Sequence, residues 1–216
     1  MPKILVTTFD PFGGERSNPA QECVRRHPAT ISGEDVMRLE VPTSFSRSAA
    51  VLERAMSHER ADYVLCVGQA GGRAAISVER VAINLVDARI PDNDGAQPHD
   101  EAIREDGAPA YFATLPTKAM IRAMRERGIP ATLSYTAGTF VCNWLMYQAL
   151  YLAERLGQGT RAGFVHVPYA PEQGVGKAEG TATMAVSDMT RALELGIGAI
   201  VEAGSYCSNW LRYRLA

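Results

Sequence analysis

The chain alternates between short apolar runs and longer stretches in which apolar residues recur every three or four positions. Short runs are typical of buried strands, and the helical spacing is typical of amphipathic helices that cover a sheet. The segment 77–80 could equally form a turn, and Gly196 and Gly198 interrupt the last helical stretch. We expect strands at residues 3–9, 36–41, 63–69, 75–85, 111–115, 131–135 and 161–167, and helices at 19–27, 44–58, 117–127, 139–156 and 181–203.

This repeated alternation predicts the fold class: a single-domain three-layer α/β/α sandwich with a mostly parallel, twisted central sheet. The length of 216 residues suits one compact domain, residues 1–216. In such folds the functional groups gather in loops beyond the carboxyl ends of the strands. Four side chains that could serve a site lie near predicted strand ends: Phe9, Gln69, Tyr135 and His166.

Composition and charge argue against several classes of protein. With 46% hydrophobic and 21% charged residues, the chain can bury a full core. The net charge of −2 and the lack of clustered Lys and Arg argue against a nucleic-acid partner. The apolar stretches are far shorter than the roughly 20 residues that a membrane span needs. The first residues run directly into a strand without an apolar leader, so we expect a cytoplasmic protein.

The four cysteines, Cys23, Cys66, Cys142 and Cys207, are widely spaced and form no CxxC pair. This spacing gives no support to a zinc site or a disulfide framework, so we expect no metal and reduced thiols. Cys66 lies within an apolar run and is expected to be an inert core thiol. Cys23 and Cys207 have no polar partner that the sequence identifies.

Cys142 is the candidate nucleophile. Gly138 ends a predicted strand, and Thr139 can cap a helix that begins at about Phe140. Cys142 then lies in the first helical turn, where unpaired backbone N–H groups and the helix dipole favour an ionised thiolate. The alternative is that Cys142 is a small apolar residue packed under the helix.

A cysteine nucleophile needs a base, and histidine has the pKa that suits this task. His166 ends an apolar strand just before a loop, where a catalytic base on an α/β scaffold would lie, although a histidine satisfied in the core is the alternative. The other three histidines, His27, His58 and His99, are expected on the surface.

A third group is normally required to hold the imidazole in one tautomer. Glu79 lies in an otherwise apolar stretch, where a carboxylate needs a polar partner to be tolerated. Asp92 and Asp94 compete with Glu79 for this role. The spacing along the chain does not choose between the three.

Six segments that span most of the chain carry a family pattern. They are Phe-Asp-Pro-Phe-Gly-Gly (9–14), Gly-Gln-Ala-Gly-Gly-Arg (68–73), Glu-Arg-Val-Ala-Ile-Asn (79–84), Asp-Ala-Arg-Ile-Pro-Asp-Asn-Asp-Gly (87–95), Ala-Gly-Thr-Phe-Val-Cys-Asn (137–143) and Phe-Val-His-Val-Pro (164–168). Together they resemble pyroglutamyl peptidase I, also called pyrrolidone-carboxylate peptidase, and they occur in the order of that family. Two departures adjoin the expected site: Thr8 stands where a glycine is usual, and Thr136 where an acidic residue is expected.

The resemblance implies a cofactor-free cysteine peptidase that removes an N-terminal pyroglutamyl residue from peptides through an acyl-enzyme. It also implies a homo-oligomer, either a dimer or a tetramer. Because pyroglutamate is a neutral, flat lactam, its pocket should be mostly apolar, with a few donors and acceptors for the ring amide. By resemblance, the site residues are Cys142 as nucleophile, His166 as base, Glu79 as orienting acid, Arg89 near the oxyanion, Phe9 and Phe12 as aromatic walls, and Gln69 facing the lactam.

Two rival functions and one rival mechanism deserve comparison. A nucleotide-binding α/β protein is indicated by the glycine-rich segment 174–180, which is expected to follow a strand and precede a helix. Its spacing fails, because Glu179 occupies the third glycine position and Ala178 stands where a phosphate loop needs Ser or Thr. A serine hydrolase lacks its GxSxG elbow. A catalytically inactive relative that acts as a binding module is disfavoured by the intact Cys142, His166 and Glu79.

Overall fold

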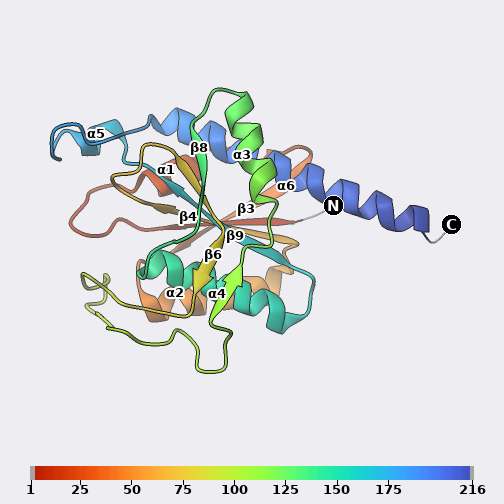
Figure 1. Ribbon diagram of the computed structural model, residues 1–216, viewed down its shortest axis with the longest axis horizontal. Coiled ribbons are helices and arrows are strands. Elements are labelled where there is room, and N and C mark those ends of the chain that lie inside the picture. Colours follow the sequence, from red (N-terminus) through yellow and green to blue (C-terminus); the bar gives the residue numbers. More distant parts are fainter. Residues whose placement is uncertain (1–2, 215–216) are drawn as a thin grey trace.

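The computed structural model describes residues 3–214, with the side chains of residues 3–204. A seven-stranded sheet with the order β2-β3-β1-β4-β9-β5-β8 lies at its centre, and β6 pairs with β7 in a separate small sheet (Figure 1). The strands are β1 (Ile4–Phe9), β2 (Thr30–Ile31), β3 (Glu34–Val41), β4 (Tyr63–Gln69), β5 (Ile76–Glu79), β6 (Val81–Ile83), β7 (Ala110–Phe112), β8 (Ala131–Ser134) and β9 (Arg161–Val167).

Helices cover both faces of the central sheet. The helices α1 (Pro19–Arg26), α3 (Thr117–Glu126) and α6 (Val186–Arg214) lie on one face, and α2 (Phe45–Glu59) and α4 (Val141–Leu156) on the other (Figure 1). A single turn, α5 (Pro171–Gly174), stands between β9 and α6. The predicted three-layer α/β/α fold is therefore confirmed.

Two of the predicted helices are capped at their N-termini by side chains. The side chain of Asn18 accepts a hydrogen bond from the backbone N–H of Ala20, and the side chain of Ser44 accepts one from that of Arg47. Each cap satisfies an N–H group that the first helical turn leaves without a partner.

The central strands β3, β1, β4 and β9 run parallel, but β5 runs antiparallel to β9, and β8 follows the direction of β5. The sheet is thus mostly parallel with a reversed edge. This reversal pairs Ser77 of β5 with His166 of β9. Because alternate residues of a strand share one face, Glu79 and His166 lie on the same face as diagonal neighbours.

The predicted single strand 75–85 is wrong, because the chain forms two strands, β5 and β6, that end and begin on either side of Arg80. Arg80 is half-buried, donates to the carbonyl of Ala113, and lies with its guanidinium carbon 5.0 Å from the centre of the Phe112 ring. These contacts to the segment around β7 turn the chain away from the central sheet. The alternative of a turn at 77–80 is also wrong, since Ser77 belongs to β5.

The last helix begins at Val186 rather than at residue 181, and neither Gly196 nor Gly198 interrupts it. Gly196 permits close packing instead: a Cβ atom there would stand 2.9 Å from the Cε atom of Met124 in α3. A glycine inside a helix can thus mark the close approach of a second helix.

The apolar side chains form two clusters, one on each face of the sheet. Cys23 and Cys66 are fully buried in them, and burial raises the pKa of each thiol to about 12, which makes both unreactive. The side chain of Cys207 lies outside the described residues. The predicted surface position of His27 is wrong, because this residue is only 1% exposed. His58 and His99 are exposed as expected. No helix within residues 3–214 combines the length and apolar character that crossing a bilayer requires.

Candidate active site

Cys142 is the second residue of α4, as the sequence predicts for a residue in the first helical turn. The predicted cap is wrong, because Phe140 occupies the N-cap position and no side chain caps the helix. The hydroxyl of Thr139 donates instead to the carbonyl of Asp87, at 2.8 Å. Thr139 therefore ties the start of α4 to the loop that follows β6.

Asn143, the neighbour of Cys142, anchors the same turn of α4. Its buried side-chain oxygen accepts from the N–H of Ile83, and its side-chain nitrogen donates to the carbonyls of Ile83 and Leu85. This set of bonds fixes the helix start relative to β6. Asn143 is not among the predicted site residues, although an amide directly after the candidate nucleophile is a signal that could have identified it.

The sulfur of Cys142 lies over the backbone of Gly68 in β4. A Cβ atom at this position would stand 2.9 Å from Sγ of Cys142 and 2.8 Å from Cζ of Phe164. Gly68 is also the register partner of His166 on the adjacent strand β9. The glycine thus leaves the space in which the thiol of α4 approaches the strand that carries the imidazole.

His166 is held by Glu79. Its Nδ1 atom lies 2.7 Å from Oε1 of Glu79, and the two side chains are 3% and 0% exposed. A second donor, Nη1 of Arg73, lies 2.6 Å from the same carboxylate oxygen. Because Nδ1–H donates to Glu79, Nε2 is the nitrogen left to accept a proton from a thiol.

The charge states of this group follow from burial and contacts. Burial lowers the pKa of His166, and the hydrogen bond to Glu79 opposes this only in part. Burial alone would raise the pKa of Glu79, but the hydrogen bond from His166, with help from Ser134 and Arg73, brings it below its usual value. The resting site therefore holds a neutral imidazole beside an ionised carboxylate.

The expectation of an ionised thiolate in the resting site is not supported. Burial, reinforced by the nearby charge of Glu79, raises the pKa of Cys142 to about 12, and Arg73 opposes this only in part. The positive end of α4 is outweighed by this desolvation. The thiol proton is therefore in place until a base removes it.

Asp92 and Asp94, the competitors of Glu79, have other partners. The carboxylate of Asp92 accepts from the backbone N–H groups of Phe45, Asp94 and Ala96, each at 2.9 Å. Asp94 forms an ion pair with Arg47. Both carboxylates organise a loop against α2, so Glu79 alone among the three contacts His166.

Cys142 and His166 line one cavity of about 470 Å³. Phe12, Gln69 and Arg89 also line it. Phe9 does not: it is 2% exposed and belongs to the apolar cluster between the sheet, α2 and α4. The expected aromatic wall is supplied by Phe12 together with Phe140, whose ring centres are 6.3 Å apart.

The side chain of Gln69 is held by a hydrogen bond from Gln173, which is not among the predicted site residues. The side-chain nitrogen of Gln173 donates to the side-chain oxygen of Gln69, at 3.2 Å, while its oxygen accepts from the N–H of Ala170. These bonds fix the orientation of the Gln69 amide. Its nitrogen is then the end that remains for a ligand.

The glycine-rich segment 174–180 does not have the context of a phosphate loop. Gly174 is the last residue of α5, so the segment follows a helix rather than a strand. Lys177 pairs with Glu15 at 2.5 Å, across the mouth of the cavity, and its Nζ atom lies 5.1 Å from the centre of the Tyr169 ring. The structure thus uses the lysine to join two loops.

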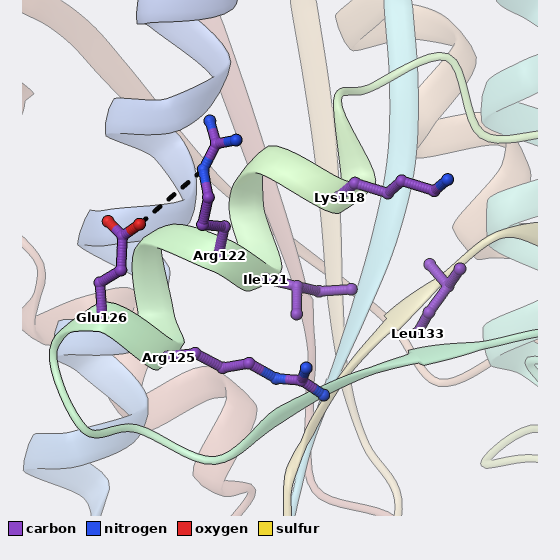
Figure 2. Close-up of a pocket in the computed structure, with 6 residues that line it drawn as sticks. All are labelled: Lys118, Ile121, Arg122, Arg125, Glu126 and Leu133. Atoms are coloured by element: carbon purple, nitrogen blue, oxygen red, sulfur yellow. Dashed lines mark ion pairs between the residues drawn. The ribbon is translucent and has the colours of Figure 1, made fainter.

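A second cavity, of about 380 Å³, lies beside α3 and β8 (Figure 2), and it shares no lining residue with the cavity that Cys142 and His166 line. Arg122 and Glu126 form an ion pair at its rim, and Arg125 donates to the carbonyl of Ala131. Ile121 and Leu133 supply its apolar side. This cavity contains no pairing of nucleophile and base.

The described part of the chain holds no cluster of side chains that could bind a metal ion. No group of three or more His, Cys, Asp or Glu side chains there could hold an ion. The cavity and its immediate surroundings bring together a thiol, an imidazole, a carboxylate and two arginines, and such groups can carry out acyl transfer.

Comparisons with known proteins show which family the chain is similar to. The model of the pyroglutamyl peptidase family matches residues 2–203. A pyrrolidone-carboxylate peptidase of Streptococcus suis (strain 05ZYH33) is 58% identical over 200 residues, which cover 93% of each chain. One from Streptococcus pyogenes serotype M12 (strain MGAS2096) is 56% identical with the same coverage.

Solved structures give the same result. The pyroglutamyl peptidase I of Bacillus amyloliquefaciens superimposes with a TM-score of 0.88 at 44% identity and covers 92% of this chain and 94% of its own. The pyrrolidone carboxyl peptidase of Thermococcus litoralis reaches a TM-score of 0.92 at 39% identity and covers 95% and 96%.

Proposed function

The chain belongs to the pyroglutamyl peptidase family of cysteine peptidases, and we propose that it removes N-terminal pyroglutamate from peptides with Cys142 as nucleophile, His166 as base and Glu79 as the orienting acid. The observation that carries this proposal is that Cys142 and His166 line one cavity while Glu79 binds Nδ1 of the imidazole. A cytoplasmic location, an assembly of two or four copies and a single catalytic domain over residues 1–216 belong to the same proposal.

Acylation begins with both reacting side chains neutral. As the thiol of Cys142 attacks the scissile carbonyl carbon, its proton moves to Nε2 of His166, and a C–S bond forms. Glu79 stabilises the imidazolium that results. Proton transfer at the moment of attack is consistent with the pKa of Cys142, which burial raises. In this scheme no thiolate has to exist before the substrate binds.

The oxyanion of the tetrahedral intermediate needs hydrogen-bond donors. The backbone N–H of Cys142 at the start of α4 and the guanidinium of Arg89 at the cavity wall are the groups proposed for this role. One such donor typically contributes about 3 kcal/mol to lowering the barrier. When the intermediate collapses, the C–N bond breaks, and the proton on His166 passes to the leaving amine.

Deacylation reverses these roles. A water molecule gives its proton to Nε2 of His166 and attacks the thioester carbonyl carbon. The C–S bond breaks, the sulfur recovers the proton, and free pyroglutamate leaves. No other reactant is required, so the cycle closes with one water consumed per peptide bond.

The cavity suits a lactam ring. Phe12 and Phe140 offer apolar walls for the ring, and the Gln69 amide, held by Gln173, can donate to the ring carbonyl. Proline has a ring of almost the same shape without that carbonyl. A prolyl substrate would leave the hydrogen-bonding groups of the site without partners. The site can therefore discriminate against proline on the order of 10⁴-fold.

The test is release of a chromogenic amine from its pyroglutamyl and prolyl amides by the wild type and by Cys142→Ser. We expect cleavage of the pyroglutamyl amide by the wild type only. Equal activity of both proteins would remove Cys142 from the mechanism, and equal cleavage of both amides would remove the lactam pocket. Clear thermal stabilisation by ATP or NAD would favour the nucleotide-binding alternative.

A further inference from the structure

We propose that Arg73 is a positioning residue for this reaction, whose guanidinium clamps Glu79 of β5 to the loop that leads into Cys142. The inference rests on the proposed function and adds a residue to it. Arg73 lies in the loop after β4 and also lines the catalytic cavity.

The clamp consists of two hydrogen bonds in different directions. Nη1 of Arg73 donates to Oε1 of Glu79 at 2.6 Å, and Nη2 donates to the backbone carbonyl of Thr136 at 3.2 Å. The planar guanidinium is suited to such a bridge, because its donors have a fixed fork geometry. Arg73 is 30% exposed, so it connects the buried carboxylate to the rim of the cavity.

Glu79 requires a cation that His166 alone does not supply. The carboxylate is 0% exposed, and a buried charge without a counter-charge is strongly destabilising. His166 is neutral in the resting site, so it donates a hydrogen bond without neutralising the charge. Among the described residues, Arg73 is the one arginine or lysine within ion-pair distance of Glu79. The guanidinium thus keeps Glu79 ionised in the position that receives Nδ1–H.

The second hydrogen bond of Arg73, to the carbonyl of Thr136, connects it to the nucleophile through the backbone. The carbonyl of Thr136 also accepts from the hydroxyl of Ser134, and the hydroxyl of Thr136 accepts from the N–H of Gly138. These bonds order the loop between β8 and α4. A bond from Arg73 to this loop therefore relates the position of the carboxylate to that of Cys142, although Arg73 contacts neither the thiol nor the imidazole in the hydrogen-bond network.

Arg73 acts on the same three groups. Its hydrogen bond helps to lower the pKa of Glu79, and its charge lowers the pKa values of His166 and Cys142. The charged groups that act on the imidazole are Glu79 from β5 and Arg73 from the loop after β4, and Cys142 from α4 lines the same cavity. The remaining ionisable residues of the cavity are Glu15, Asp87, Arg89, Tyr169 and Lys177.

Loss of the Arg73 charge therefore shifts the pH dependence of kcat/KM to higher pH. Activity requires a neutral His166 and an ionised Glu79, so it rises with pH through the pKa values of both groups. Without the guanidinium, both pKa values rise. The acidic limb of kcat/KM should then move to higher pH, which a purely structural role for Arg73 would not cause.

The experiment compares three substitutions of Arg73 with one matched control. Arg73→Met removes the charge and both hydrogen bonds, Arg73→Gln keeps a short donor without the charge, and Arg73→Lys keeps the charge without the fork. The control is Arg80→Met, which removes a half-buried arginine that binds a carbonyl outside the cavity. Thermal unfolding of all four variants shows whether each is folded.

We expect kcat of Arg73→Met to fall on the order of 10²-fold with little change in KM. The acidic limb should move to higher pH in Arg73→Met and Arg73→Gln and stay in place in Arg73→Lys and Arg80→Met. Wild-type kinetics for Arg73→Met would overturn the proposal. So would equal losses in Arg73→Met and Arg73→Lys with an unmoved acidic limb.

A substrate-free readout separates this inference from the proposed function. The rate at which iodoacetamide alkylates Cys142, measured by mass spectrometry of the peptide that contains it, reports the ionised thiol fraction. We expect slower alkylation in Arg73→Met than in Arg73→Lys at the same pH. An enzyme that cleaves no pyroglutamyl amide would refute the proposed function, while equal alkylation rates would refute the role of Arg73.

Discussion

The sulfur of Cys142 lies directly over Gly68, so closely that a methyl group on that glycine would stand 2.9 Å from Sγ. Because Gly68 pairs with His166 across β4 and β9, this contact relates α4, which carries the proposed nucleophile, to β9, which carries the proposed base. A single missing side chain thus sets how near the thiol can come to the strand of the base.

The first prediction concerns Gly68→Ala. The new methyl group would displace Sγ of Cys142 and the Phe164 ring, and overpacking of this kind costs about 1–3 kcal/mol. Because misplacement of a reacting group by about 1 Å is expensive, kcat should fall on the order of 10²-fold. Steady-state kinetics and thermal unfolding measure the two effects. Gly176→Ala is the control, since a Cβ atom there meets nothing within 4 Å; a wild-type kcat for Gly68→Ala would contradict the account.

The second prediction separates the two phenylalanines. Phe12→Ala removes a cavity wall, so KM for a pyroglutamyl amide should rise about tenfold, while the free energy of unfolding changes little. Phe9→Ala removes a buried core side chain and should lower the free energy of unfolding by about 3–5 kcal/mol. Denaturant unfolding and KM measured on both variants provide the test. A larger rise in KM for Phe9→Ala than for Phe12→Ala, in folded protein, would restore Phe9 to the pocket.

The third prediction concerns the ion pair between Glu15 and Lys177. It joins the loop that carries Phe12 to the loop after α5, and both side chains are partly exposed. Lys177→Ala should therefore raise KM by no more than about fivefold and leave kcat unchanged, as the loss of a modest ion pair implies. Lys118→Ala, at the second cavity, is the matched control (Figure 2). A large fall in kcat with constant KM would place Lys177 in the chemistry instead.

The fourth prediction concerns stability against acid. Burial lowers the pKa values of His27 and His166 in the folded protein below the value of about 6.5 that unfolded chains have. As pH falls below about 6.5, the unfolded chain binds protons first, so the free energy of unfolding must decrease. The slope from the two histidines vanishes only well above that pH, where the unfolded chain no longer binds these protons.

Denaturant unfolding between neutral and mildly acidic pH measures this slope. His27→Leu removes one of the two buried imidazoles, so the free energy of unfolding should fall less steeply with acidification than in the wild type. Identical slopes for the two proteins would mean that His27 does not titrate as described.

Much of this fold follows from local patterns, and the residues show why. The mostly apolar runs at β1 and β4 are typical of buried strands, and Asn18 and Ser44 cap the helices that follow them with their own side chains. The reversed direction of β5 could not be predicted from local patterns. It depends on pairing with β9, more than 80 positions away in the chain, and no periodicity encodes direction.

The same distinction applies to the site. Cys142 and His166 could be proposed from a helix start and a strand end, which are local features. The choice of Glu79 over Asp92 and Asp94 required the tertiary pairing of β5 with β9. Arg73 is a half-exposed arginine in a glycine-rich loop, and in the sequence it resembles any solvated charge. Its role depends on two partners, Glu79 and Thr136, that only folding brings together.

The most direct test of the central claim is to mix the enzyme with excess pyroglutamyl ester, quench with acid within the first turnovers, and measure the mass of the peptide that contains Cys142. The account predicts a fraction of this peptide carrying one pyroglutamyl group as a thioester, and none in Cys142→Ser. Full turnover by the wild type with an unmodified Cys142 peptide, even when hydrolysis is slowed by low temperature, would contradict the claim that the acyl group passes through this sulfur.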